Sequence, residues 1–502
     1  MLSGALLALS FPKFGHPAAG WVALAPLLVA VPGAPLRRAL ALGFLTGVVY
    51  FTGTLYWLVE VMTTFGGLNT LTAAGSAALL IIYLSLYPAL FAMTVAWLSA
   101  RLGLRALALA PAVWVATELG RMYVWSGFPW ALLGYSQATV LPVAQAAAVV
   151  GVFGLSLLVC AVSAALAHAW IRRRPLPLAG TVVAVLVIAA WGAWRVSTRA
   201  LVREGHPIRV GVVQANIEQE DKWNPALSDA IFERYLAMSR RALADRAEFV
   251  IWPESSTPFY FENDPRGLRL RTLAQQSRAP FLIGSDQIEP VPLTRDTVAG
   301  TTPQSRPENR FYNAAFLVGP DGATSGVYRK MHLVPFGEYV PLKRLLFFVG
   351  PLVEAVSDFS PGDSPSTLPI GGRLASVAIC YEVIYPSLIR SFVSRGSELL
   401  TTITNDAWYG RSSAAYQHWE QASLRAIEEG RYLARAANTG ISGFVDPYGR
   451  VLAASALFEQ TVLVEDLQFI RARTIYSRTG DLVAWLCLLN SGFWILYAGR
   501  RA

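Results

Sequence analysis

The sequence predicts an α-helical polytopic membrane domain of about eight transmembrane helices, joined to an α/β domain outside the bilayer. The first observation is composition: the 502 residues are 54% hydrophobic and only 15% charged, too apolar for a water-soluble protein of this length. The second is distribution, because apolar stretches fill residues 1–200 and return at 480–502, whereas residues 206–470 alternate short β-rich runs with helical ones. We therefore expect a transmembrane domain at 1–200 with seven spans, a second domain at 206–470 and a C-terminal transmembrane helix at 480–502.

The apolar stretches differ in length. A helix that spans the hydrocarbon core needs about 20 residues, which five of the eight stretches provide alone and the first two do not. The first stretch has no basic flank and no cleavage site, which indicates a truncated or minimally started span rather than a signal peptide. The stretches are residues 1–12, 18–33, 39–59, 70–100, 106–120, 138–171, 177–197 and 482–499.

Positive charge is concentrated in the membrane half. Residues 1–205 hold 12 Lys and Arg against 3 Asp and Glu, whereas residues 206–502 hold 30 of each. The net charge of +9 therefore indicates membrane topology rather than nucleic-acid binding, because Lys and Arg prefer cytoplasmic loops. This preference predicts a cytoplasmic N-terminus and C-terminus and an extracytoplasmic position for residues 206–470. The basic loops hold Arg37, Arg38, Arg101, Arg105, Arg172 to Arg174, Arg500 and Arg501, and the opposite short loops hold only Lys13 and Arg121.

The outer domain reads as an α/β domain because strand-like and helix-like runs alternate along it. Pro320 to Gly322 and Asp446 to Gly449 are turn sequences that would close β-hairpins. Strands are expected at 208–214, 249–252, 280–285, 313–318, 376–379 and 399–404, and helices near 226–245, 265–277, 385–394 and 415–436.

Three segments of this domain place a reactive side chain at the end of an apolar strand: Glu254 after Trp252-Pro253, Lys330 after Tyr328-Arg329, and Cys380 after Ile379. Acyl transfer through a thioester requires these groups, since a carboxylate can take the thiol proton, the thiolate can attack, and an ammonium can stabilise the oxyanion. Each residue also has an ordinary interpretation: a buried Cys as a small hydrophobe, a solvated Glu, or a surface Lys. The spacing of Glu254, Lys330 and Cys380 in the sequence does not by itself show that they meet in space.

Cys380 is the one cysteine of the polar region, because Cys160 and Cys487 lie in apolar runs. A disulfide framework in the outer domain is therefore not expected.

Around Glu254, Lys330 and Cys380 the chain resembles the carbon-nitrogen hydrolase (nitrilase) superfamily, which has a Glu-Lys-Cys triad in an α-β-β-α sandwich. More narrowly, it resembles the bacterial apolipoprotein N-acyltransferases, and the resemblance extends into the membrane half, which a generic nitrilase lacks. The motifs are Thr64 to Gly67, Gly127 to Trp130 and Gly134 to Gln137 in the membrane half, and His332 to Pro341, Asn405 to Gly410 and Ala437 to Ile441 in the outer domain.

The resemblance implies roles for individual residues. Glu254 would be the general base, Lys330 the oxyanion stabiliser and Cys380 the nucleophile that accepts the acyl group, with Glu338 as a further carboxylate of the site.

Three more residues are implied to lie near the site. Tyr381 and Glu382 follow the nucleophile and would shape its pocket, and Trp223 resembles a loop tryptophan beside the site, although a half-exposed packing aromatic fits it almost as well. We expect no metal and no cofactor. His332 and His418 lie in motifs, but no His, Asp and Glu spacing is typical of a metal site, and no Gly-rich loop indicates a nucleotide.

The implied function is transfer of a fatty acyl chain from a membrane phospholipid, through a Cys380 thioester, to the N-terminal α-amine of an S-diacylglyceryl-cysteine apolipoprotein. The resemblance and the loop charges together predict a monomeric, multi-pass protein of the bacterial inner membrane with its catalytic domain on the periplasmic side.

Two other functions compete. A membrane-tethered amidase or nitrilase that hydrolyses a small amide would use the same triad, and only the membrane half argues against it. A transporter or lipid-binding module fits less well, because Glu60 and Glu118 lie near predicted span ends rather than in mid-bilayer.

Leu342 to Phe359 is more apolar than a soluble loop should be, and it contains Leu345 to Val349 beside Lys343 and Arg344. We interpret it as an arm that dips into the outer leaflet and gates lipid entry, in preference to a buried packing segment.

Overall fold

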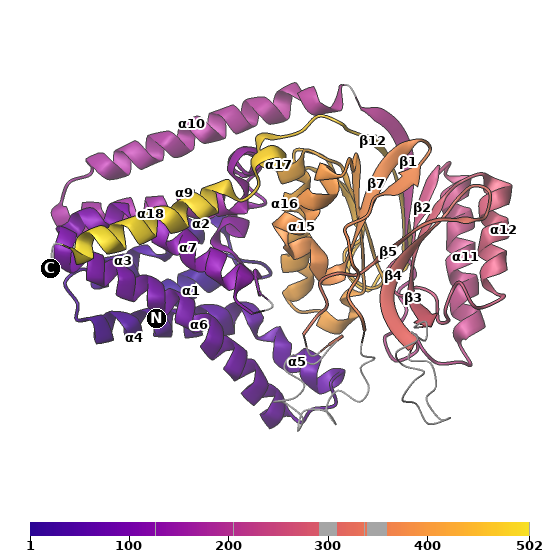
Figure 1. The fold of residues 1–502 in the computed structure, drawn as a ribbon, viewed down its shortest axis with the longest axis horizontal. Coiled ribbons are helices and arrows are strands. Elements are labelled where there is room, and N and C mark those ends of the chain that lie inside the picture. The colour runs from indigo at the N-terminus through magenta and orange to yellow at the C-terminus, as the bar shows by residue number, and fades with distance from the viewer. Residues whose placement is uncertain (126, 204, 291–308, 336, 339–358, 501–502) are drawn as a thin grey trace, which may run out of the picture.

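A computed structural model describes residues 1–125, 127–203, 205–290, 309–335, 337–338 and 359–500. The molecule has two halves that lie side by side: a helical half on the left of Figure 1, and a half built of two sheets with flanking helices on the right. The proposed arm falls outside the described residues except for Phe359.

Five helices of the helical half are long and apolar enough to cross a membrane: α4 (Leu36–Leu55), α6 (Thr70–Leu102), α9 (Ala147–Arg172), α10 (Leu176–Thr198) and α18 (Leu482–Gly499). The other three expected spans form shorter helices, so the number of crossings stays a prediction. The span expected at 18–33 is divided between α2 (Pro17–Ala23) and α3 (Ala25–Ala30), and the other two correspond to α1 (Leu2–Ala8) and α7 (Ala110–Tyr123).

Short helices connect the long ones near the outer domain. They are α5 (Trp57–Thr64), α8 (Leu141–Ala144) and the 3₁₀ turn η2 (Leu133–Gln137), with η1 (Gly103–Ala108) and η3 (Ala200–Val202) at other helix ends.

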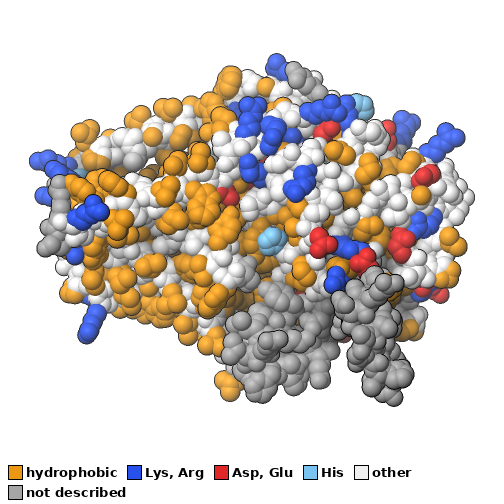
Figure 2. Space-filling model, in the orientation of Figure 1, with side chains coloured by type: hydrophobic (Ala, Val, Ile, Leu, Met, Phe, Trp, Pro, Cys, Tyr) orange, Lys and Arg blue, Asp and Glu red, His pale blue; other side chains and the backbone are white. Residues whose placement is uncertain are grey.

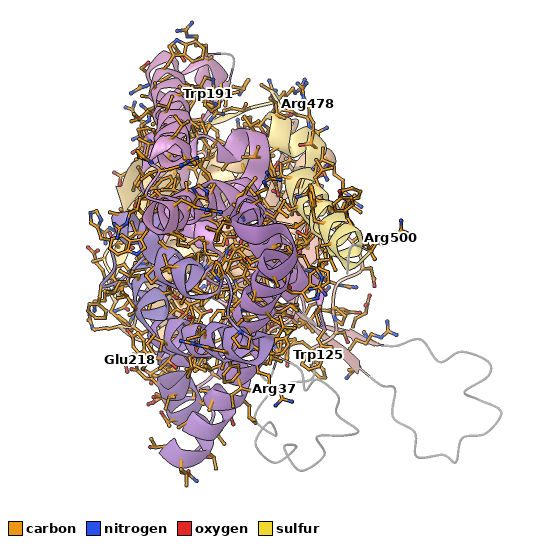
Figure 3. All side chains as sticks on the ribbon, turned by 90° about the vertical axis from the view of Figure 1, so that its left-hand side faces the viewer. Arg37, Trp125, Trp191, Glu218, Arg478 and Arg500 are labelled. Carbon is orange, nitrogen blue, oxygen red and sulfur yellow. The ribbon has the colours of Figure 1, made fainter. Side chains whose placement is uncertain are left out.

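Helix α10 runs along one side of the helical half (Figure 1), where it contacts α8 and α9. Only 6% of an apolar 18-residue stretch of α10 is buried inside the structure, compared with 61% of the corresponding stretch of α9. In the end-on view its Trp191 lies at the rim (Figure 3), and Leu186, Val187 and Trp194 are each more than 60% exposed. A helix this apolar and this exposed is suited to contact with lipid.

Apolar side chains cover the visible face of the helical half, while charged side chains lie mainly on the sheet half and at the far end of the helices (Figure 2). That far end holds the turn between α9 and α10 and the C-terminus (Figure 1). Arg172 to Arg174 and Arg500 therefore lie at one end of the helical half. This agrees with the sequence analysis, which puts these arginines on the same side of the membrane.

The sheet half contains two six-stranded sheets, in the orders β12-β1-β2-β3-β4-β5 and β11-β10-β9-β8-β7-β6. In Figure 1, α11 and α12 cover the outer face of the first sheet, and α15 and α16 lie between the second sheet and the helical half. The expected α-β-β-α sandwich is thus confirmed. The first and last strands are neighbours, with His206 opposite Phe469.

The bounds of these elements agree with most of the sequence expectations. The strands are β1 (His206–Gln214), β2 (Phe249–Ile251), β3 (Phe281–Pro290), β4 (Asn309–Val318), β5 (Thr324–Arg329), β6 (Leu368–Ile370), β7 (Arg373–Ile379), β8 (Leu399–Thr404), β9 (Leu433–Ala437), β10 (Gly443–Val445), β11 (Val451–Ala454) and β12 (Thr461–Phe469). The helices are α11 (Ser228–Ala244), α12 (Gly267–Ser277), α15 (Pro386–Ser394), α16 (Ala414–Glu429) and the short α17 (Ile475–Thr479).

One expected element is wrong at its end. The helix predicted near 415–436 stops at Glu429, because Gly430 adopts a φ of +62° and turns the chain. Residues 433–437 instead form β9, which is buried between β8 and β10. The two predicted hairpins are confirmed: β4 pairs with β5 and β10 pairs with β11, both antiparallel.

Buried hydrogen bonds join α16 to the helical half. Gln417 Oε1 accepts from Trp130 Nε1 at 2.7 Å, and Glu428 Oε1 accepts from the Val152 amide at 2.8 Å. Polar groups buried this completely need fixed partners. The two halves are therefore held in one defined arrangement.

Candidate active site

The three predicted catalytic residues follow strands of both sheets: Glu254 follows β2, Lys330 follows β5 and Cys380 follows β7. All three are buried, with Lys330 only 1% exposed. A charged lysine is kept at such a position only when it is paired.

Lys330 lies between two carboxylates. Its Nζ is 3.2 Å from Glu254 Oε1 and 2.9 Å from Glu338 Oε1. Burial alone would lower the pKa of Lys330, but the charges of Glu254 and Glu338 outweigh it and hold that pKa well above its usual range. The structure thus places Glu338 with Glu254 and Lys330, and the lysine stays a cation.

Glu254 is fixed on both of its oxygens. Oε1 accepts from Asn313 Nδ2 at 2.7 Å in addition to Lys330, and Oε2 accepts from the Asn405 amide at 2.9 Å. Burial acts to raise the pKa of Glu254, but the charges of Lys330 and Lys222 outweigh it and leave the pKa below its usual value. Glu254 is therefore an oriented, ionised carboxylate at neutral pH, as a general base must be.

Cys380 begins the 3₁₀ turn η5 (Cys380–Ile384) with a φ of +53°, which places it in the left-handed region. Burial, together with the charge of Glu254, raises the pKa of its thiol above the usual range, while Lys330 acts in the opposite direction. The thiol is therefore protonated at rest, and its attack requires a base.

Glu382 acts on the backbone of the site. Its Oε1 accepts from the Met331 amide at 2.6 Å and from the Tyr328 hydroxyl at 2.8 Å, and its Oε2 accepts from the Ile379 amide at 2.8 Å. Burial raises the pKa of Glu382 to about 7. This side chain joins the segment that carries Lys330 to the turn that carries Cys380.

Tyr381 faces the helical half. Its ring lies 6.4 Å from that of Phe128 and 5.4 Å from that of Tyr385. The motif of the membrane half at Gly127 to Trp130 thus comes next to Tyr381, the residue that follows Cys380.

Trp223 is 45% exposed, and its predicted position beside the site stays a prediction. Its neighbour Lys222 is the residue that the structure places at the site. Lys222 is 5% exposed and donates from Nζ to the Glu254 carbonyl at 3.1 Å. The sequence motif that singled out Trp223 contains Lys222, but nothing in it marks the lysine as buried.

The sequence analysis assigned no role at the site to several further residues. Asn313, at the edge of the triad, donates from Nδ2 to Glu254 and, at 2.9 Å, to Glu338. His418 and Arg435 both contact Asp406 behind the nucleophile, at 3.1 and 2.8 Å. The motif Asn405 to Gly410 pointed to Asp406, but no spacing rule connects it to the other two.

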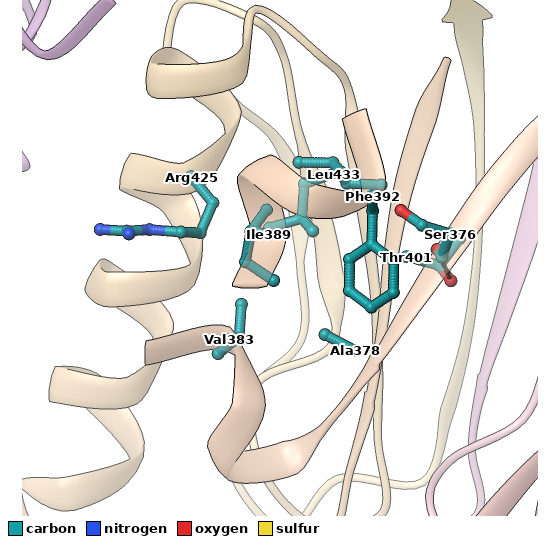
Figure 4. Close-up of a pocket in the computed structure, with 9 residues that line it drawn as sticks. Ser376, Ala378, Val383, Ile389, Phe392, Thr401, Arg425 and Leu433 are labelled. Carbon is teal, nitrogen blue, oxygen red and sulfur yellow. Dashed lines mark hydrogen bonds between the residues drawn. The ribbon is translucent and has the colours of Figure 1, made fainter. Parts of the chain in front are cut away.

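Within the described ranges, His, Cys, Asp and Glu side chains form no group of three or more that could hold a metal ion. A small cavity lies behind the nucleophile turn, between Ala378, Val383 and Phe392, and Arg425 points out of it toward the helical half (Figure 4). None of the predicted site residues lines this cavity. The buried group of Glu254, Lys330 and Cys380 is the candidate catalytic centre.

Comparison with known proteins gives consistent matches for both halves. Residues 3–166 match the model of the apolipoprotein N-acyltransferase N-terminal domain, and residues 209–476 match the carbon-nitrogen hydrolase model. The chain is 38% identical to the apolipoprotein N-acyltransferase of Geobacter metallireducens, covering 100% of this chain and 95% of that one. It is 34% identical to the protein of that name from Methylococcus capsulatus, with the same coverage.

Solved structures match a little more than half of the chain. An amidase of the nitrilase superfamily from Nesterenkonia is 20% identical, with a TM-score of 0.41, and covers 57% of this chain and 98% of its own. A nitrilase superfamily member from Saccharomyces cerevisiae is 20% identical, with a TM-score of 0.39, and covers 55% of this chain and 93% of its own.

Proposed function

The chain belongs to the apolipoprotein N-acyltransferase family, and on that premise we propose that its acyltransferase activity proceeds through a thioester on Cys380. The observation that carries the proposal is the buried group of Glu254, Lys330 and Cys380, in which an ionised carboxylate and an ammonium act on a protonated thiol. The domain limits of 1–200, 206–470 and 480–502 are part of the same proposal.

In the first half-reaction, the Cys380 thiol gives its proton to Glu254 as the sulfur attacks the ester carbonyl of a phospholipid. The carbonyl oxygen becomes an oxyanion that Lys330 stabilises. The C–O bond then breaks, Glu254 returns the proton to the alkoxide of the lysophospholipid, and the acyl chain remains on sulfur as a thioester.

In the second half-reaction, the α-amine of a diacylated apolipoprotein attacks the thioester. An unperturbed α-amine has a pKa of about 7.7 to 8.0, so a sizeable fraction is neutral at pH 7. Glu254 takes the proton lost by nitrogen as the amide forms, and the departing thiolate regains a proton. The same site thus serves donor and acceptor in turn, which gives ping-pong kinetics.

The helical half supports a lipid donor and a membrane location. Its exposed apolar surface on α10 is suited to contact with acyl chains. We place the chain, as a monomer, in the bacterial inner membrane with the outer domain in the periplasm, because Arg172 to Arg174 and Arg500 lie at the end of the helical half away from that domain.

Mass spectrometry of the purified protein with phospholipid alone tests the proposal. A fatty acyl mass is expected on the peptide that contains Cys380, and Cys160 and Cys487 serve as internal controls because both are free thiols. Addition of a diacylated lipopeptide should remove that mass and yield the N-acylated lipopeptide. Equal loss of the thioester with and without lipopeptide, with release of free fatty acid, would support the tethered hydrolase instead.

A further inference from the structure

The carbonyl of the nucleophile has a dedicated partner. Cys380 adopts a left-handed φ of +53°, a conformation that costs free energy in a residue with a side chain and persists only where its surroundings hold it. His418 Nε2 lies 3.1 Å from Cys380 O, and the imidazole is fully buried.

Arg435 determines which imidazole nitrogen carries the proton. Arg435 Nη2 lies 2.9 Å from His418 Nδ1, and since a guanidinium can only donate, Nδ1 accepts. The hydrogen of the neutral ring is then on Nε2, where it faces Cys380 O. Burial and the charge of Arg435 lower the pKa of His418, which favours this neutral form.

Asp406 also faces this imidazole. Its Oδ1 is 3.1 Å from His418 Nδ1 and accepts from the Thr404 hydroxyl at 2.8 Å. A protonated imidazole would donate from Nδ1 to this carboxylate while keeping its hydrogen on Nε2. In both of these states the ring donates to the nucleophile's carbonyl.

The ring of His418 is held in turn by the helical half. The ring of Trp130 lies 5.7 Å from the imidazole, at an angle of 34°. The preceding residue, Gln417, accepts from Trp130 Nε1 and donates from Nε2 to Pro12 O at 3.1 Å and Thr54 O at 3.2 Å. A continuous buried chain therefore runs from the ends of the membrane helices to the nucleophile.

We propose that His418 is a positioning residue for acyl transfer, which fixes the nucleophile turn through the Cys380 carbonyl, and that Trp130 of the helical half holds it in place. The inference rests on the proposed role of Cys380. Because a peptide unit is planar, fixing the carbonyl of residue 380 also fixes the next N–H and limits the directions open to the thiol. The membrane half thereby completes the catalytic geometry as well as anchoring it.

The test compares His418→Gln with His418→Met in the full-length protein. The Gln amide can still donate to Cys380 O, whereas Met has similar bulk and no donor. Acyl-enzyme formation from phospholipid should slow about 100-fold in His418→Met, as for a misplaced catalytic group, and stay within about tenfold in His418→Gln. Alkylation of Cys380 by iodoacetamide, which needs a thiolate but not its orientation, should change much less. Trp419→Phe, next to His418 on α16, is the matched control.

The outcomes separate the two proposals. If the wild-type protein gains no acyl mass on Cys380, the proposed function is wrong and the inference falls with it. If the wild-type protein is acylated and folded His418→Met is acylated at the same rate, only the inference is wrong. Should His418→Met fail to fold, Trp130→Leu replaces it: slower acylation of the folded variant supports the positioning role, and an unchanged rate overturns it.

Discussion

Glu254 and Glu338 accept hydrogen bonds from the same two donors, since Lys330 Nζ and Asn313 Nδ2 each lie within 3.2 Å of one oxygen of both carboxylates. Two carboxylates so close repel each other, and the positive charge of the lysine between them offsets that repulsion.

Lys330→Met should therefore abolish turnover and also destabilise the fold, by about 3–5 kcal/mol, because it leaves buried charge without a partner. Adding Glu338→Gln should restore part of that stability and none of the activity. Thermal unfolding in detergent measures both variants. Equal unfolding temperatures for the single and the double variant would show that the two carboxylates do not interact.

Glu254→Gln should have opposite effects on two measurements. The charge of Glu254 raises the pKa of the Cys380 thiol, so its removal lowers that pKa and alkylation by iodoacetamide should begin at a lower pH than in the wild-type protein. Turnover should nevertheless fall by about 10²–10⁴-fold, because the base is lost. Alkylation that shifts to higher pH would contradict the arrangement described here.

Asn313→Asp should change the pH dependence of acylation. The pKa of Glu254 lies below its usual value of 4.5, so the wild-type rate should decline only at acidic pH below that value. A carboxylate in place of the Asn313 amide removes a donor and adds like charge, which raises the pKa of Glu254. The base then becomes protonated, and activity is lost, at a higher pH. A pH profile of acyl-enzyme formation that matches the wild-type profile would rule this out.

Glu382→Gln should damage the protein although the two side chains have the same shape. Glu382 accepts from three backbone amides, those of Ile379, Met331 and His332. Either orientation of the Gln amide would point an N–H group at one or more of these donors, at a cost of about 1–3 kcal/mol for each buried group left unsatisfied. Both the unfolding temperature and the acylation rate should fall, and a fully active, equally stable variant would remove the proposed bridging role.

Membrane topology can be checked with single cysteines in a background from which Cys160, Cys380 and Cys487 have all been replaced by Ala. Arg173→Cys should resist a membrane-impermeant thiol reagent in spheroplasts, and Asp245→Cys, after α11, should react. Permeabilised cells provide the control, because both positions should then react. The reverse pattern would place the outer domain in the cytoplasm.

The sequence was sufficient to predict the division into a helical and an α/β half, because hydrophobic periodicity and strand alternation are local signals. It failed at Leu433 to Ala437, where the alanines and Arg435 favour a helix locally but burial between β8 and β10 imposes a strand.

The triad could be proposed from motifs, since each of its residues follows a strand within a recognisable segment. Asn313 and Lys222 could not, because their roles depend on atoms more than 30 positions away in the chain: Asn313 reaches Glu254 from β4, and Lys222 reaches the carbonyl of the same residue. His418 lay in a motif, but its partner is a backbone carbonyl, for which no sequence pattern exists.

The pairing of β1 with β12 affects how the protein is made. The sheet neighbour of β12 is β1, the first strand of the domain, so one edge of β1 stays open until residues 461–469 have been synthesised. Open edges are templates for aggregation. Completion of the first sheet must therefore wait until almost the whole chain has left the ribosome, just before α18 enters the membrane. Nascent chains that stop short of β12 should be substrates for chaperones and proteases, whereas insertion of the first membrane helices can proceed without it.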